Sequence, residues 1–355
     1  MISFARGAPA PECLDAELLA DCARVAIERD PSVLAYGPGG GYAPLRERLA
    51  AAHGVDPGRI VVTNGGLQGF VFYAEELLAE RPGRVLLEAP TYDRPLKVLA
   101  RLGADVVPVA MDAEGLDPDA LELALGEGPA RFLYTIPTFQ NPSGRTLPTE
   151  RRQRVVELAR AHGVPVLEDD PYGRVRYEGE PPPLLHELEG GELVTYASSF
   201  SKTVAPGLRV GWFVAPASLS ARIEARAVST YISPPFLTQA MVFELIDRGA
   251  FEPNLERIRG LLKLRRDAML AALGRHLAGE ATWSEPEGGY FLWVDLAVDA
   301  GELLTRAEAA GVTFVKGVDF SPDGSGASSA RLAFSYASPS EIEEGVSTLS
   351  TLLRA

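Results

Sequence analysis

The sequence has little cysteine and little histidine. Cys13 and Cys22 are its two cysteines, and neither belongs to a CxxC pair. The four histidines lack the HExxH spacing, or any similar clustered spacing, with which proteins bind metals; they are His53, His162, His186 and His276. We therefore expect no disulfide and no metal site in this chain.

The sequence also lacks a long hydrophobic run and an excess of basic charge. Met1–Gly7 has no basic segment followed by an apolar stretch, and no run approaches the length of a membrane span. The 34 basic and 48 acidic residues give a net charge of −14, whereas a nucleic-acid-binding protein usually carries a basic face. We expect a cytoplasmic protein that binds neither nucleic acid nor membrane.

The chain is long enough for a large domain with a smaller companion. It has 355 residues, of which 46% are hydrophobic. Short apolar runs alternate with amphipathic stretches, which is the pattern of a mostly parallel α/β sheet between helices. The predicted sheet has seven strands, at Arg59–Val62, Arg84–Glu88, Asp105–Val109, Arg131–Thr135, Val164–Glu168, Leu193–Ala197 and Val210–Val214.

Helical spacing predicts the segments that connect these strands. The connecting helices are Leu67–Leu78, Arg94–Arg101 and Glu150–Ala161, and a long helical region that starts near Ala221 includes Leu255–Leu273. The rest of the chain is predicted to be a small α+β domain, with strands within Gly289–Asp295, Val312–Val315 and Ala330–Phe334. Ser321–Ser329, rich in Ser, Gly and Pro, is predicted to be a surface loop.

Residues 198–211 place one lysine among hydroxyls. Lys202 follows Ser199 and Ser201, and Arg209 stands seven residues after it, with a predicted strand on each side. A lysine that forms a Schiff base with a phosphorylated aldehyde needs an amine that can lose its charge, with hydroxyls and a guanidinium to hold the phosphate. The stretch therefore predicts a pyridoxal-phosphate enzyme.

Polar residues follow other predicted strands, where α/β sheets usually bind ligands. Gly65 and Gly66 would direct free amides at an anion or form an ordinary tight turn. Tyr92 would stack on a flat ring or serve packing, and Asn141 would donate to a phenolic oxygen or form a turn. The acids of Glu168–Tyr172 offer a partner for a pyridinium nitrogen, or are solvated loop acids. Their occurrence in series favours a ligand site.

The order of these motifs resembles that of fold-type I pyridoxal-phosphate aminotransferases. The motifs are Tyr36-Gly37-Pro38 through Gly41, Asn141-Pro142-Ser143-Gly144, Glu168–Tyr172, Ser199–Lys202 with Gly207-Leu208-Arg209, and Arg331. Within this fold type the chain is most similar to the 2-aminoadipate, kynurenine and aromatic aminotransferase subgroup. The resemblance implies a large cofactor-binding domain over residues 37–235. It also implies a small domain over residues 1–36 and 236–355, whose N-terminal segment contacts the substrate.

The resemblance also implies roles around the cofactor ring. Lys202 would form the Schiff base and later move the proton between the substrate α-carbon and the cofactor. Asp169 would pair with the pyridine nitrogen, and Tyr92 would stack on the ring. Asn141 and Tyr172 would hydrogen-bond the phenolic oxygen.

The cofactor phosphate has its own predicted set of ligands. The resemblance implies Ser199, Ser201, Arg209 and the amides of Gly66 and Leu67. The family usually has Ser-Gln at the positions of Gly66 and Leu67, so one hydroxyl contact to the phosphate is missing here. Lower cofactor affinity, or compensation by Thr63 or Gln68, is the expected consequence.

Substrate binding and assembly follow from the same resemblance. Arg331 would grip the substrate α-carboxylate with its planar fork, and Asn141 would touch the same group. Arg6 stands out in a small, apolar N-terminal segment and is a hypothetical contact to the substrate side chain. Tyr36 would reach over from a second subunit and complete the neighbouring site, so a homodimer is expected.

The implied reaction is transfer of an amino group from an α-amino acid to a 2-oxo acid (EC 2.6.1 type). The expected acceptor is 2-oxoglutarate, used in a ping-pong reaction through Lys202. The motifs do not select between 2-aminoadipate, aromatic and branched-chain donors.

Two other functions use the same fold and cofactor. A β-eliminating lyase or a cyclopropane-forming synthase stays open, because fold and cofactor do not determine the reaction. The same domain also occurs as the effector-binding half of bacterial regulators, behind a DNA-binding helix-turn-helix. This sequence begins directly at the Phe4–Pro9 segment, so we expect an enzyme rather than a regulator.

Overall fold

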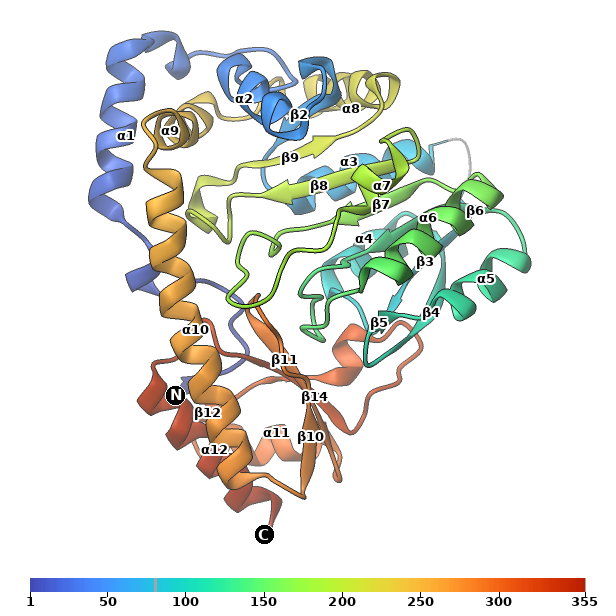
Figure 1. The fold of residues 1–355 in the computed structure, drawn as a ribbon, viewed down its shortest axis with the longest axis vertical. Coiled ribbons are helices and arrows are strands. Elements are labelled where there is room, and N and C mark those ends of the chain that lie inside the picture. The colour runs from blue at the N-terminus through green and yellow to red at the C-terminus, as the bar shows by residue number, and fades with distance from the viewer. Residues whose placement is uncertain (80–81, 355) are drawn as a thin grey trace.

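A mixed sheet of eight strands organises the upper part of the molecule in Figure 1. The structure is a computed structural model that describes residues 1–79 and 82–354. The strand order is β2-β9-β8-β7-β6-β3-β4-β5, and all but β9 and β5 run parallel. The strands are β2 (Ile60–Thr63), β3 (Arg84–Ala89), β4 (Asp105–Asp112), β5 (Gly115–Leu116), β6 (Ala130–Thr135), β7 (Val166–Asp169), β8 (Val194–Ser199) and β9 (Gly211–Val214).

The predicted mostly parallel sheet between helices is confirmed, and each of the seven predicted strands lies in it. The structure adds β5, a two-residue strand that turns back antiparallel onto the end of β4. Two residues are too few to show a hydrophobic period, which explains why this strand was not predicted.

Both faces of the sheet are buried, because side chains along each strand point alternately to either side. Phe132 and Tyr134 pack with α3 on one face, whereas Leu133 packs with α6 on the other. The first face is covered by α3 (Gly66–Leu77), α4 (Asp93–Arg101) and α8 (Ala217–Tyr231). The second face is covered by α2 (Ala43–His53), α5 (Pro118–Gly126), α6 (Thr149–His162), α7 (Leu185–Glu189) and α9 (Phe236–Asp247).

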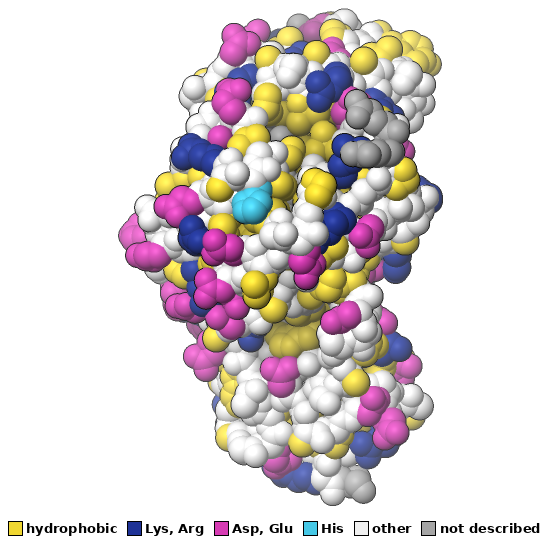
Figure 2. Space-filling view, turned by 90° about the vertical axis from the view of Figure 1, so that its right-hand side faces the viewer, with side chains coloured by type: hydrophobic (Ala, Val, Ile, Leu, Met, Phe, Trp, Pro, Cys, Tyr) yellow, Lys and Arg dark blue, Asp and Glu magenta, His cyan; other side chains and the backbone are white. Residues whose placement is uncertain are grey.

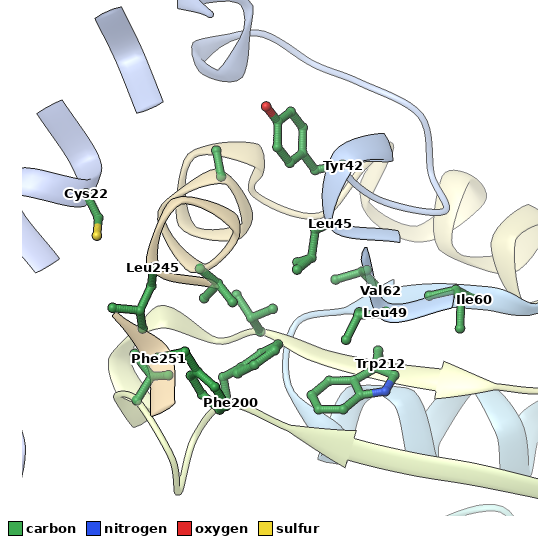
Figure 3. Packing of buried hydrophobic residues seen from close by; sticks show 14 of the residues in the cluster. Cys22, Tyr42, Leu45, Leu49, Ile60, Val62, Phe200, Trp212, Leu245 and Phe251 are labelled. Carbon is green, nitrogen blue, oxygen red and sulfur yellow. The ribbon is translucent and has the colours of Figure 1, made fainter. Parts of the chain in front are cut away.

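An aromatic cluster anchors the segment that follows β8. The ring centroid of Phe200 lies 4.7 Å from that of Trp212 and 5.9 Å from that of Phe251, and Figure 3 shows Phe200 and Phe251 together beside Leu245. The same cluster includes Cys22 of α1 (Ala16–Arg29). Phe200 is two residues from Lys202, so this packing positions the lysine loop.

The lower part of the molecule is built on a four-stranded antiparallel sheet of order β10-β11-β14-β13. These strands are β10 (Ala281–Trp283), β11 (Phe291–Leu296), β14 (Ser329–Ala333) and β13 (Val315–Lys316). They pack against the end of α10 (Phe251–His276), α11 (Ala300–Ala309) and α12 (Pro339–Leu353). At the N-terminus, β1 (Ile2–Ser3) pairs parallel with β12 (Val312–Thr313).

Helix α10 runs from the upper part to the lower part (Figure 1). Its 26 residues span about 39 Å at the usual rise per residue. Its beginning packs in the cluster of Phe200, and Met269 and Leu273 near its end pack in the lower core. We propose that the boundaries between the large and the small domain lie after residues 36 and 235.

Charge is mixed over the face shown in Figure 2, where acidic and basic side chains are interspersed. Among the described residues, no helix is both long enough and apolar enough to cross a membrane. Residues 321–328 contain no helix or strand and lead into β14.

Candidate active site

A cavity of about 390 Å³ lies where the carboxyl ends of β2, β3, β6, β7 and β8 meet β14. Strands that run parallel deliver the residues after their ends to one edge of the sheet. All the predicted site residues except Arg6 and Tyr36 line this cavity: Gly66, Leu67, Tyr92, Asn141, Asp169, Tyr172, Ser199, Ser201, Lys202, Arg209 and Arg331. A wider groove of about 750 Å³ between Arg145 and Trp283 contains none of them.

Lys202 projects into the cavity beneath the N-terminal segment. Its Nζ donates a hydrogen bond of 2.6 Å to the carbonyl of Gly7, and Tyr290 Oη donates to the Lys202 carbonyl at 2.9 Å. Burial, with smaller effects from Arg331 and Arg209, lowers the pKa of Lys202 to about 8. The amine is therefore neutral in many more molecules near pH 7 than an ordinary lysine would be.

Asp169 is the one acid of the 168–170 run that faces the cavity. Glu168 accepts hydrogen bonds from the amides of Leu185 and His186 at the start of α7. Asp170 accepts from the amide of Gly173 in the turn that follows. Three adjacent acids thus have three different roles.

The carboxyl group of Asp169 is removed from water and has two other acids nearby, Asp170 and Glu88. Burial, with smaller contributions from Asp170 and Glu88, raises the pKa of Asp169 to about 7. Tyr134 Oη donates a hydrogen bond of 2.7 Å to Asp169 Oδ2, which acts in the opposite direction. Asp169 would thus ionise more readily once a positive group binds beside it.

Arg209 and the start of α3 form a cradle for an anion. Arg209 has a left-handed backbone conformation with φ 55° and donates to the carbonyls of Asn64 at 3.0 Å and Pro206 at 3.3 Å. Gly65 precedes the helix with φ 81°, and a side chain there would overlap the Arg209 guanidinium. The free amides at the helix start and this guanidinium suit a phosphate.

Thr63 and Gln68 brace this turn. The Thr63 hydroxyl donates to the carbonyl of Gly65 at 3.2 Å, and Gln68 Oε1 accepts from the amide of Asn64 at 3.0 Å. Both side chains thus have local partners, and neither lines the cavity.

Arg331 lies between two aromatic rings at the other end of the cavity. Its guanidinium is 4.2 Å from the ring centre of Phe291 and 4.9 Å from that of Phe320. Nη1 donates to Asn141 Oδ1 at 2.9 Å and Nη2 donates to the carbonyl of Ala5 at 2.8 Å, whereas Nε is buried and has no partner among the described residues. Burial lowers its pKa to about 10, so it remains a cation with donors to spare.

Two tyrosines complete the walls. Tyr92 lies directly before α4 and lines the cavity. Tyr172 packs with its ring centroid 5.7 Å from that of Tyr290 and 5.8 Å from that of Phe291. The Lys202 amine lies 5.7 Å from the Tyr172 ring centre.

Arg6 and Tyr36 lie outside the cavity of this protomer. Ala5 and Gly7 line the cavity, but the exposed side chain of Arg6 stacks at 4.2 Å on the ring of Tyr336. Tyr36 is 80% exposed. Both assignments remain predictions.

Sequence reasoning missed several groups that shape the site. Tyr134 and Phe291 lie within apolar runs and look like ordinary core residues, and Phe320 lies in a mixed segment without a pattern. The Gly7 carbonyl gives no sequence signal because it is backbone. The sequence does show that Tyr134 lies on the predicted strand directly before the one that Asp169 follows. To infer a contact between the two side chains, one also needs the register in which β6 pairs with β7.

Comparisons with known proteins find similarity along nearly the whole chain. A family model for aminotransferase class I and II matches residues 3–349. A 2-aminoadipate transaminase of Thermus thermophilus is 37% identical over 361 aligned positions, which cover 100% of this chain and 90% of that protein.

Two solved structures are similar along the whole chain. One is an alpha-aminoadipate aminotransferase from Thermus thermophilus complexed with N-(5'-phosphopyridoxyl)-L-leucine. Its TM-score is 0.95 at 35% identity, with 100% of this chain and 92% of that chain covered. The other is a Pyrococcus horikoshii kynurenine aminotransferase, with a TM-score of 0.95 at 34% identity and coverage of 100% and 91%.

Proposed function

The chain belongs to the aminotransferase class I and II family and is a pyridoxal-phosphate-dependent aminotransferase, and we propose that it transfers the amino group of an α-amino acid to 2-oxoglutarate through Lys202. The observation that carries this proposal is that three of the cationic side chains lining the cavity have no acid partner among the described residues. Lys202, Arg209 and Arg331 all line it, and within residues 1–79 and 82–354 none of them forms an ion pair.

This cavity fits the cofactor and a substrate together. Cations without an acid partner call for anions, and pyridoxal phosphate brings a phosphate while an amino acid brings a carboxylate. The unpartnered Nε of Arg331 supports one anion site. Gly65 lies so close to the Arg209 guanidinium that a Cβ at residue 65 would overlap it, and this close approach supports the second anion site.

We assign the cofactor contacts as follows. The phosphate is held by Ser199, Ser201, Arg209 and the amides of Gly66 and Leu67. Tyr92 stacks on the ring, Asp169 pairs with the ring nitrogen, and Asn141 and Tyr172 bind the phenolic oxygen. Each of these residues lines the cavity.

Lys202 carries the chemistry of the chain. When bound, pyridoxal phosphate supplies an aldehyde that condenses with amines and a protonated ring that takes up the electron pair of the substrate Cα–H bond. The pKa of the Lys202 amine is lowered to about 8. This amine accepts the proton from the substrate α-carbon and then donates it to the cofactor.

Arg331 and Asn141 orient the substrate. Arg331 has two of its five donors engaged by Asn141 and Ala5, and the free ones bind the α-carboxylate. Its position between Phe291 and Phe320 keeps water from competing. A carboxylate held there lets Lys202 reach the α-carbon.

The active unit in this proposal is a homodimer in which Tyr36 completes the neighbouring site. Exposed apolar side chains from two adjoining segments support it: Leu34, Tyr36, Val228 and Ile232. The two segments touch, because the amide of Gly37 donates to Ser233 Oγ at 3.3 Å. An apolar surface of this kind is typical of a protein interface.

The acceptor proposal is tested with a panel of amino donors and 2-oxoglutarate, with glutamate formation as the readout. The panel includes 2-aminoadipate, kynurenine, leucine and aromatic amino acids, since similar proteins are named for, or complexed with, related compounds. We expect glutamate and parallel lines in double-reciprocal plots, as in ping-pong kinetics. Release of ammonia without any need for 2-oxoglutarate would instead indicate a lyase.

The lysine is tested directly by reducing the holoenzyme with borohydride and mapping the modified peptide by mass. We expect the pyridoxyl group on Lys202. A label on any other lysine would refute the assignment.

A further inference from the structure

Tyr134 lies behind the wall of the candidate cofactor site and hydrogen-bonds one of the residues that line it. It lies on β6, fully buried, and does not line the cavity. Strand β6 pairs with β7 so that Tyr134 lies opposite Leu167 and Thr135 opposite Glu168. This register brings the Tyr134 hydroxyl to Asp169 Oδ2, to which it donates at 2.7 Å.

The Tyr134 ring is held in place by packing. Phe70 of α3 meets it edge-on, with ring centroids 5.2 Å apart. Burial and the nearby Asp169 raise the pKa of Tyr134, so the phenol keeps its proton. The hydroxyl therefore acts as a donor to the carboxylate.

Asp169 depends on this donor. In the described part of the chain, no other group donates a hydrogen bond to its carboxyl oxygens. The charged groups that act on it are Asp170, the next residue in the chain, and Glu88 on β3, and both disfavour its ionised form. The hydrogen bond from Tyr134 works against them, because a donor stabilises a carboxylate over a carboxylic acid.

We propose that Tyr134 is a positioning residue that keeps Asp169 ionised and oriented, with Oδ2 engaged and Oδ1 left for the cofactor ring nitrogen. This inference rests on the role proposed above for Asp169. Without the hydroxyl, the carboxyl holds its own proton more tightly and shares less negative charge with the ring nitrogen. The ring then carries less positive charge.

The test is Tyr134→Phe, which removes the hydroxyl and keeps the ring. The first readout is the dissociation constant of pyridoxal 5'-phosphate from the holoenzyme, which we expect to rise about tenfold, as for loss of one hydrogen bond to a charged group. The second is the midpoint pH of the visible absorbance of the bound cofactor. It should rise by about 0.5 to 1 unit, because a less positive ring repels a proton on the Lys202 nitrogen less.

Tyr73→Phe is the matched control. Tyr73 is a buried tyrosine of the same hydrophobic cluster, and its hydroxyl has no carboxylate partner in the part of the chain that the structure describes. We expect neither readout to change. Thermal unfolding of both variants checks that they are folded.

A double-mutant cycle with Asp169→Asn separates the inference from its premise. If Tyr134 acts through Asp169, Tyr134→Phe adds little in the Asp169→Asn background. Fully additive effects, or a folded Tyr134→Phe enzyme with unchanged affinity and midpoint, would overturn the inference. If Asp169→Asn alone leaves both readouts unchanged, the proposed role of Asp169 fails first, and the inference fails with it.

Discussion

The guanidinium of Arg331 and the side-chain oxygen of Asn141 form a hydrogen bond of 2.9 Å across 190 residues of sequence. Arg331 belongs to β14 of the lower sheet, and Asn141 to the loop after β6 of the upper sheet. The proposed substrate carboxylate site therefore spans the two parts of the molecule, and its geometry depends on how they pack.

Arg331→Lys tests the carboxylate site. Lysine keeps the charge but loses the planar fork, so we expect the KM for the amino donor to rise about 10- to 100-fold, as for loss of one or two charge-assisted hydrogen bonds. Cofactor affinity should stay within about twofold. Steady-state kinetics and a cofactor titration measure both quantities. Arg176→Lys is the matched control, since Arg176 also stacks on an aromatic ring, Phe139, but lies outside the cavity.

Gly65→Ala tests the phosphate cradle. A Cβ at Gly65 would overlap the Arg209 guanidinium, so we expect the dissociation constant of pyridoxal phosphate to rise at least about tenfold. Gly54→Ala is the control, because Gly54 also has a positive φ, of 64°, but nothing lies within 4 Å of the added Cβ. That control should lose only about 1 to 2 kcal/mol of stability, the cost of the left-handed backbone conformation for a residue with a Cβ. Equal cofactor affinity of the two variants would argue against the cradle.

We expect Asp169 to make the stability of the cofactor-free protein depend on pH. Its pKa is about 7 in the folded protein and about 4 when unfolded. The folded state thus binds the extra proton between these values, and stability is lost as pH rises through that window. Relative to the parent, Asp169→Asn should gain on the order of 2 to 4 kcal/mol between pH 4 and pH 7.

Urea unfolding of both cofactor-free proteins at several pH values measures this difference. Comparing the variant with its parent cancels the other titrating groups, including His53, whose pKa burial lowers to about 4. A difference that is independent of pH would show that the Asp169 carboxyl is not protonated on folding.

Tyr36 is tested by mixing subunits. Tyr36→Ala and Lys202→Ala homodimers should each be nearly inactive. After the subunits are exchanged, half of the dimers are mixed, and each mixed dimer has one complete site, so activity should recover to about a quarter of the parent value. No recovery, despite confirmed exchange, would show that Tyr36 does not act across the interface.

Arg6 is tested through specificity. If its charge meets the substrate side chain, Arg6→Ala should lower kcat/KM for acidic donors more than for aromatic donors. Tyr336→Phe, which keeps the ring under Arg6, is the control. An unchanged ratio of the two kcat/KM values would remove Arg6 from substrate recognition.

The strands were predictable because both sheet faces are buried. Val85, Leu86 and Leu87 are apolar in sequence because they face alternate sides of one buried sheet. The gathering of the candidate site residues around one cavity was predictable for a related reason. Polar residues placed directly after such strands meet at one edge of a parallel sheet.

The choice among neighbouring groups was not predictable. The sequence presents three consecutive acids at 168–170, and only the pleat and the partners around them direct Asp169 to the cavity and Glu168 to the start of α7. In the same way, Arg6 and Arg331 are both arginines of apolar segments. Only packing between Phe291 and Phe320 makes Arg331 a buried cation.

The sequence by itself therefore determined the sheet, the lysine loop and the set of residues that surrounds Lys202, because these depend on local period and on order along the chain. The tertiary structure decided which of those residues work together. The hydrogen bonds of Tyr134 to Asp169 and of Arg331 to Asn141 depend on strand register and on the packing of two sheets. Such contacts join residues far apart in the chain, and no local pattern encodes them.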